Sequence, residues 1–108
     1  MEFTRVKLEI FIPETHVDAL RESLAEAGAG VIGNYDHCCS VMPVKGYWRP
    51  LDGADPYDGT VGEVSEGHEY KVEVNCPREI LAAVIKSIRA VHPYEEPLIN
   101  IIPLMDEP

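Results

Sequence analysis

Basic residues are scarce in this sequence of 108 residues. Nine lysines and arginines stand against 19 aspartates and glutamates, and the formal net charge is −10. Because an excess of negative charge repels a phosphate backbone, we expect no nucleic-acid partner.

Long apolar runs are missing as well. A helix that crosses a membrane needs roughly 18 or more apolar residues in succession, and no stretch of this sequence approaches that length. The first residues, Met1 to Arg5, contain no apolar segment of a secretion signal, and the C-terminal end has no lipidation motif. We therefore expect a cytoplasmic protein with no membrane partner.

Cysteine is also rare, with Cys38, Cys39 and Cys76 as its three occurrences. An odd count in a chain expected to be cytoplasmic argues against a disulfide framework, so the thiols should be reduced. Hydrophobic residues make up 45% and charged residues 26% of the chain, as in ordinary globular proteins. This length suits one core, and we predict a single packed domain over residues 1–108.

The first half of the sequence begins with a strand and a helix. Apolar residues alternate over Val6–Ile12, which predicts a half-buried strand, and helical spacing predicts a helix from Val17 to Ala27. Thr15 and Asp18 have the spacing of a capping box, and Gly28 suits a left-handed helix end.

The next segments indicate a strand and a long loop. A second, irregular strand is predicted from Asp36 to Val44, in which Pro43 marks a sheet edge or a bulge. The stretch Leu51–Ser65, rich in Gly, Asp and Pro, is typical of a long loop, and such loops often carry function.

The second half repeats the order of strand, helix and strand. Alternation predicts a third strand over Glu69–Cys76, and Pro77 suits the first turn of a helix. An apolar stripe from Ile80 to Val91 predicts that helix, and a final strand is expected over Leu98–Leu104.

The resulting order is βαββαβ. Right-handed crossovers in this order place both helices on one face of a four-stranded antiparallel sheet, with the first and third strands in the centre. We predict an α+β protein with the ferredoxin-like plait, of the PII and CutA type.

Three segments of the chain resemble a known family. Residues 28–38 (GAGVIGNYDHC), 46–50 (GYWRP) and 92–97 (HPYEEP) are similar in order and spacing to the YqfO domain. That domain is inserted in the larger Nif-three-like proteins and also occurs alone at about this length. The last segment also resembles the His-Pro-Tyr-Glu stretch of CutA proteins, which share the plait with PII signalling proteins and assemble as trimers.

The resemblance implies a fold and a homo-oligomer, with a trimer favoured. It does not imply the paired metals or the GTP cyclohydrolase label of the larger proteins, because their metal ligands lie outside the inserted domain. The chain departs from the family pattern at Cys39, which is an extra residue, and at Trp48, where phenylalanine is commoner. We expect no enzyme activity, and no catalytic residue is assigned.

The glycine-rich segment offers one candidate ligand site, at Gly30, Gly33 and Tyr35. Successive unhindered N–H groups can ring an anion, as in a phosphate cradle. The alternative is a structural turn that uses positive φ, and it is favoured because the Gly-Lys-Ser/Thr ending of a P-loop is absent.

A second candidate is a soft-metal site for zinc or copper at His37 and Cys39. Alternation along a strand would put these two side chains on one face, and further ligands would come from another subunit. The alternative is that the thiols pack as small apolar groups.

The segment 92–97 offers a third candidate, in which His92, Glu95 and Glu96 form a metal site or an acid–base pair. The alternative is that its two prolines stiffen the link to the last strand while Tyr94 packs and the carboxylates face water.

Aromatic residues beside the long loop form the last candidate. Trp48, with Tyr47, Tyr57 and Arg49, could build a ligand wall or a subunit interface, and core packing is the competing explanation. With Tyr94 from the resembling segment, Trp48 and Arg49 complete the predicted ligand-binding residues.

These observations predict a homo-oligomeric binding or regulatory module for a small ligand, a metal ion or a protein partner. An oligomer would also cover an open sheet face that is apolar. The alternative is a CutA-like protein that binds divalent metals, and a third possibility is an enzyme completed only in the oligomer.

Overall fold

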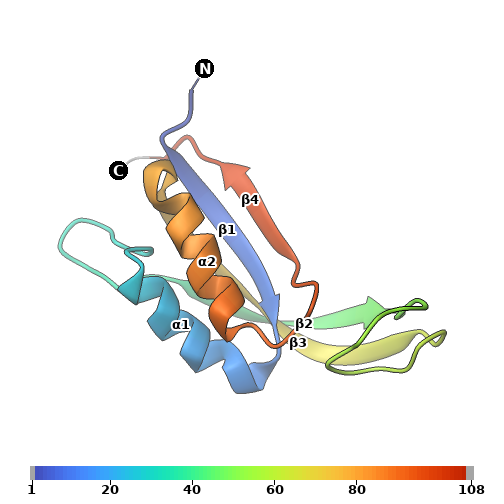
Figure 1. Cartoon of the computed structure of the whole chain (residues 1–108). Coiled ribbons are helices and arrows are strands. Elements are labelled where there is room, and N and C mark those ends of the chain that lie inside the picture. The colour runs from blue at the N-terminus through green and yellow to red at the C-terminus, as the bar shows by residue number, and fades with distance from the viewer. Residues whose placement is uncertain (1, 107–108) are drawn as a thin grey trace.

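Figure 1 shows the computed structural model of the chain, which describes residues 2–106. Its elements are β1 Arg5–Ile12, the 3-10 turn η1 Glu14–His16, α1 Val17–Glu26, β2 Ser40–Trp48, β3 Ser65–Pro77, the 3-10 turn η2 Arg78–Ile80, α2 Leu81–Val91 and β4 Ile99–Pro103. The predicted order βαββαβ is confirmed. No helix within these residues has the length and apolarity needed to cross a membrane.

The four strands form one antiparallel sheet in the order β2-β3-β1-β4, with α1 and α2 on the same face (Figure 1). The first and third strands are central, as predicted for the ferredoxin-like plait. In this register Ile10 lies opposite Val72 on one side and Ile99 on the other. The fold class predicted from the sequence is therefore confirmed.

The core lies between the sheet and the two helices. Alternate residues of β1 and β3 point into it, and they meet the apolar stripes of α1 and α2. The fully or almost fully buried apolar residues are Val6, Leu8, Ile10, Ile12, Leu20, Leu24, Ala29, Val72, Val74, Cys76, Val84 and Ile88. Truncating such a leucine or isoleucine to alanine costs roughly 2–5 kcal/mol, so this layer supplies the stability on which the exposed parts depend.

The helix α1 begins at the predicted residue and ends as predicted, but its N-terminal end is not capped as predicted. Gly28 has φ +93°, its N–H bonds to the Ala25 carbonyl, and the Ala29 N–H bonds to the Leu24 carbonyl, which together close the helix. The predicted capping box of Thr15 and Asp18 is wrong, because Pro13 leads into the turn η1 and the N-cap residue of α1 is His16, whose side chain makes no capping bond to the described residues. The Thr15 hydroxyl lies 2.8 Å from His16 Nδ1 instead.

The strand β2 starts later and runs further than predicted. Its position at the edge of the sheet suits Pro43, as expected. It extends through Gly46 to Trp48 because β3 begins early enough to pair with it, and Trp48 lies opposite Ser65. The hairpin of β2 and β3 therefore projects beyond the helices (Figure 1), and the loop at its tip covers residues 49–64.

Two other boundaries differ slightly from the prediction. Pro77 ends β3 and precedes the turn η2, so it is not in the first turn of α2. The last strand covers Ile99–Pro103, one residue shorter at each end than expected.

The centre of the sheet's open face is charged, so it does not need the cover that an apolar open face would require. Lys7 Nζ lies 2.7 Å from Glu73 Oε2, and Lys71 Nζ lies 3.9 Å from Glu9 Oε2. Asn100 donates a hydrogen bond of 3.2 Å to Glu9 as well. Cross-strand pairs of opposite charge therefore stabilise the open face of the sheet.

Candidate ligand-binding cleft

A cleft of about 640 Å³ lies where the β2–β3 hairpin leaves the body of the protein. It is bounded by β2, by the loop that follows it, and by residues 94–98. Five of its lining residues occupy open-face positions of the sheet: Phe11, Val44, Gly46, Trp48 and Glu69. The cleft has the size and the mixture of apolar walls and few polar groups that are typical of small-molecule sites.

Trp48 forms one wall of the cleft and is half-buried. Its Nε1–H donates to the Asp58 carbonyl at 3.0 Å, which ties the hairpin loop to the strand. The ring lies against Gly67, where an added Cβ would come within 2.9 Å of it. Trp48 thus packs within its own hairpin and lines the cleft, and it is not among the residues of the core cluster.

Tyr94 carries the main polar group inside the cleft. Its hydroxyl donates to Glu69 Oε2 at 2.9 Å. Burial, and then the bond to the Glu69 carboxylate, raise the pKa of Tyr94 above its ordinary value, so the phenol stays a neutral donor. Its ring lies 5.8 Å from that of Tyr57, and the two form a tilted aromatic pair.

His92 contacts Tyr94 through its ring and through a hydrogen bond. It is only 8% exposed, and Nε2 lies 2.7 Å from the Phe11 carbonyl while Nδ1 accepts the Tyr94 N–H at 3.2 Å. This pattern requires the tautomer with its proton on Nε2. Burial lowers the pKa of His92, against the opposing effect of the Phe11 carbonyl, so the ring is neutral. Both nitrogens are engaged within the chain.

The carboxylates of segment 92–97 have different roles. Glu95 Oε1 accepts the Asp55 N–H at 2.9 Å, which joins this segment to the hairpin loop. Glu96 is exposed and lines the cleft, as does Arg49. The structure therefore brings together Trp48, Arg49 and Tyr94 of the predicted ligand-binding residues.

Gly30 and Gly33 lie away from this cleft, in residues 27–39 between α1 and β2. Gly30 is buried with φ +77°, its N–H donates to the Asn75 carbonyl, and an added Cβ would lie 2.5 Å from the Cys38 carbonyl oxygen. Gly33, with φ +56°, sits in a tight turn that two backbone bonds close between Ile32 and Tyr35. These bonds favour the structural turn over the phosphate cradle, because the Gly30 N–H is already used.

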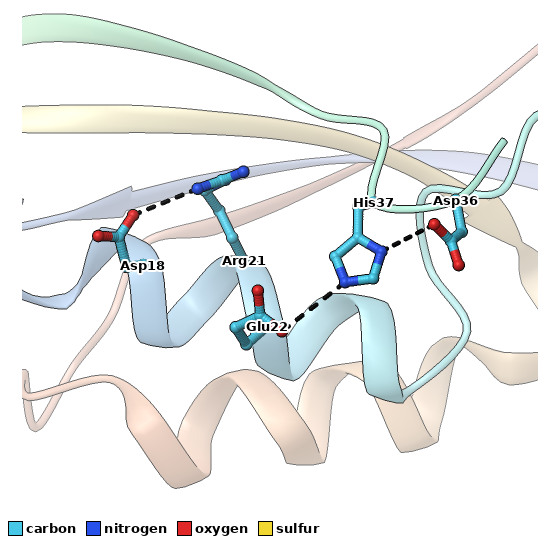
Figure 2. Close-up of polar contacts among 5 residues, drawn as sticks. All are labelled: Asp18, Arg21, Glu22, Asp36 and His37. Atoms are coloured by element: carbon cyan, nitrogen blue, oxygen red, sulfur yellow. Dashed lines mark hydrogen bonds and ion pairs between the residues drawn. The ribbon is translucent and has the colours of Figure 1, made fainter.

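His37 closes the same segment onto α1, as Figure 2 shows. Its Nδ1 lies 2.9 Å from Asp36 Oδ1 and its Nε2 lies 3.7 Å from Glu22 Oε2. Asp36 is the main cause that raises the pKa of His37, and Glu22 adds to it. Figure 2 also shows a second ion pair within α1, between Arg21 and Asp18 at 3.2 Å.

Strand alternation predicts a face shared by His37 and Cys39, and that prediction is wrong. β2 begins only at Ser40, and His37 has φ +58°, outside any extended strand. Cys39 packs against the core as a half-buried thiol, and the cysteines are free.

The four predicted metal ligands fall in two places. His37 and Cys39 precede β2, whereas His92 and Glu95 lie beside the cleft. Within residues 2–106 no three His, Cys, Asp or Glu side chains are arranged to hold a metal ion. A zinc or copper site built from these residues therefore stays a prediction that needs a second subunit.

Sequence reasoning missed Glu69, Phe11 and Asp58. Alternation placed Glu69 on the polar side of a strand, but the tyrosine that bonds it lies 25 positions away. No local pattern reports a contact at that separation.

Curated relatives match nearly the whole chain. The GTP cyclohydrolase 1 type 2 homolog of Mycobacterium leprae is 41% identical over 102 residues, which are 94% of this chain and 26% of that protein. The protein of the same name from Bacillus subtilis is 39% identical over 102 residues, or 94% of this chain and 27% of that protein. The chain thus spans about a quarter of the length of these relatives. No protein-family profile matches it.

Solved structures give the same result for the fold. A Bacillus cereus protein related to NIF3 superimposes with a TM-score of 0.85 at 33% identity, over 96% of this chain and 26% of that one. The periplasmic divalent cation tolerance protein CutA of Archaeoglobus fulgidus gives 0.71 at 20% identity, over 95% of this chain and 86% of that one. This chain is therefore related, over nearly its whole length, to one segment of the NIF3-related proteins, and it has the fold of CutA.

Proposed function

We propose that the chain is a homo-oligomeric binding module whose small-ligand site is the cleft beside Trp48 and Tyr94. The observation that carries this proposal is the bond from Tyr94 to Glu69, because it orients a neutral hydroxyl oxygen and a carboxylate inside a mostly apolar cleft. Convergent polar groups in an apolar cleft are typical of ligand sites.

The proposed oligomer is a trimer, as the resemblance to CutA proteins implies. Apolar side chains on and around the edge strand β4 support an interface between copies. The exposed ones are Leu98 at 54%, Ile101 at 47%, Ile102 at 38% and Met105 at 77%. Light scattering coupled to size-exclusion chromatography would measure the mass, and a monomer at all concentrations would contradict the proposal.

Thermal unfolding with a panel of small molecules tests the site, because a ligand that binds the native state raises Tm by mass action. The panel contains nucleotides, amines and carboxylic acids. Tyr94→Phe should reduce the shift, and Tyr35→Phe, which changes a 75% exposed tyrosine outside the cleft, should leave it unchanged. A shift that ignores Tyr94→Phe would place the ligand elsewhere.

A metal-handling role is the second candidate. It is supported by the fold shared with the divalent cation tolerance protein of Archaeoglobus fulgidus. Zinc and copper should then raise Tm in the oligomer, and His37→Ala or Cys39→Ser should remove the shift. No shift with either metal would reject this candidate.

We propose no catalytic step for this chain. The curated relatives carry GTP cyclohydrolase in their names, but the chain matches about a quarter of their length. Incubation with GTP, followed by chromatography, tests the point, and any turnover that survives purification would contradict the proposal.

A further inference from the structure

Glu69 differs from the other carboxylates on the open face of the sheet. Glu73 is paired with Lys7 and Glu9 with Lys71. Within the described residues no lysine or arginine nitrogen lies within 4.0 Å of Glu69, and its hydrogen-bond partner is the neutral Tyr94 hydroxyl. The nearby Lys45 pairs with Glu66 at 3.2 Å.

The position of Glu69 makes this lack of a cation important. The residue is half-buried, lies opposite Val44 in the sheet, and lines the cleft together with Phe11 and Trp48. A carboxylate in partly apolar surroundings loses hydration, and a cation restores the lost stabilisation. Of its two oxygens, Oε2 accepts the Tyr94 bond, and Oε1 accepts none from the described residues.

The walls around Glu69 also suit a positive charge. Trp48, Tyr57 and Tyr94 all line the cleft, and the face of an aromatic ring attracts an ammonium or guanidinium group. Among the ionisable side chains of the lining, four are acidic, namely Asp58, Glu69, Glu95 and Glu96, and two are basic, namely Lys45 and Arg49. The chain as a whole carries a net charge of −10, which favours approach by cations.

We propose that this cleft binds an organic cation, with a primary ammonium or amidinium-type group on Glu69 and an apolar body against the aromatic side chains. The inference deepens the proposed function and rests on it. A bare metal ion fits less well, because within residues 2–106 no three metal-ligating side chains converge.

Matched small molecules test the charge. Benzamidine and phenethylamine are titrated into the full chain by calorimetry at low salt, beside the neutral benzamide and the anionic benzoate. The fluorescence of Trp48, the single tryptophan, gives a second readout from the cleft wall. We expect the cations to bind at least tenfold more tightly than benzamide, and benzoate more weakly still.

Variants locate the charge. Glu69→Gln should weaken benzamidine at least tenfold and leave benzamide unchanged, and Glu69→Asp should retain most of the affinity for the cation. Glu73→Gln is the matched control, since it removes a carboxylate of the same face that already has a lysine partner. Unfolding curves of each variant confirm that it is folded.

The outcomes separate the two proposals. If benzamide or benzoate binds as tightly as benzamidine, the proposed preference for a cation is wrong, but the proposed ligand site in the cleft is retained. If none of the compounds binds, both the proposed ligand site and the proposed preference for a cation are wrong. If Glu69→Gln lowers the oligomer mass and no amine binds, the cation on Glu69 belongs to a neighbouring copy of the chain, which overturns the inference.

Discussion

Two loops with glycines flank β2, and they are held in different ways. Residues 27–39 precede the strand and are joined to the rest of the chain by the backbone bond from Gly30 to Asn75, with the pair of His37 and Glu22 beside it. Residues 49–64 follow it and are tied by bonds that use side chains, from Trp48 to Asp58 and from Asp55 to Glu95. In the first loop the N–H groups of Gly30 and Cys38 are bonded within the chain, whereas the second loop lines the cleft. Glycine content alone therefore does not identify a binding loop.

The largest expected effect tests the first loop. Gly30→Val should lower the free energy of unfolding by about 3 kcal/mol, because φ +77° is strained for a β-branched residue and the Cβ would meet the Cys38 carbonyl. Urea denaturation measures the change. Gly53→Ala in the second loop is the control, since it has φ +93° but nothing within 4 Å, and should cost about 1 kcal/mol. If both variants lower the free energy of unfolding equally, the close packing around Gly30 does not make the first loop more sensitive than the second.

The next effect tests the second loop. Trp48→Ala should cost about 2–3 kcal/mol, since it removes a half-buried ring and the bond to Asp58. Hydrogen exchange should then rise in residues 49–64 and stay unchanged in residues 27–39. Trp48→Phe keeps most of the apolar contact and should cost about 1 kcal/mol. Faster exchange in both loops would mean that they are not held independently.

A smaller effect isolates the polar contact in the cleft. Tyr94→Phe should cost about 1 kcal/mol in urea denaturation, because it removes the donor to Glu69 and leaves the ring in place. Tyr35→Phe, on the exposed turn of the first loop, should have no measurable effect. If both variants lower the free energy of unfolding, the loss at Tyr94 does not come specifically from the hydrogen bond to Glu69.

The smallest effect concerns pH, and the two histidines should act with opposite sign. The pKa of His37 is raised above 6.5 in the folded state by Asp36, so its stabilising contribution is present below pH 6.5 and is lost as pH rises through the folded pKa. The pKa of His92 is lowered from 6.5 by burial, so stability is lost as pH falls from 6.5 towards the folded pKa.

Denaturation curves between about pH 5 and 8, the range in which histidines titrate, would resolve the two contributions. His37→Asn should flatten the alkaline side of the stability profile, and His92→Asn should flatten the acidic side at a larger cost in stability, because it removes a buried group with two bonds. An alkaline side that is unchanged in His37→Asn would show that the pairs of His37 with Asp36 and Glu22 do not stabilise the folded protein.

Much of the fold could be predicted from the sequence, because strand and helix periodicity acts over neighbouring residues. The alternation in Val6–Ile12 and the stripe that ends at Val91 both correspond to observed elements. The errors arose where a distant partner decided the outcome. β2 extends to Trp48 because β3 is there to pair with it. His37, with φ +58°, lies in the loop before β2, where it meets Asp36 and Glu22 of α1.

The candidate site could be predicted only in part. Motifs single out Trp48, Arg49 and Tyr94, and all three line the cleft. No motif identifies Glu69 and Phe11, since their roles depend on contacts across the sheet and with segment 92–97.

The sequence by itself determined the order of the elements, the buried faces of β1 and β3, and the kinship with the NIF3-related proteins. Each of these depends on local periodicity or on motifs that can be read along the chain. Only the tertiary structure decided that Glu69 bonds to Tyr94 and, among residues 2–106, has no lysine or arginine partner, because that requires side chains 25 positions apart to meet. Local periodicity assigns a side chain to a face, whereas its partner there is chosen by the packing of the whole chain.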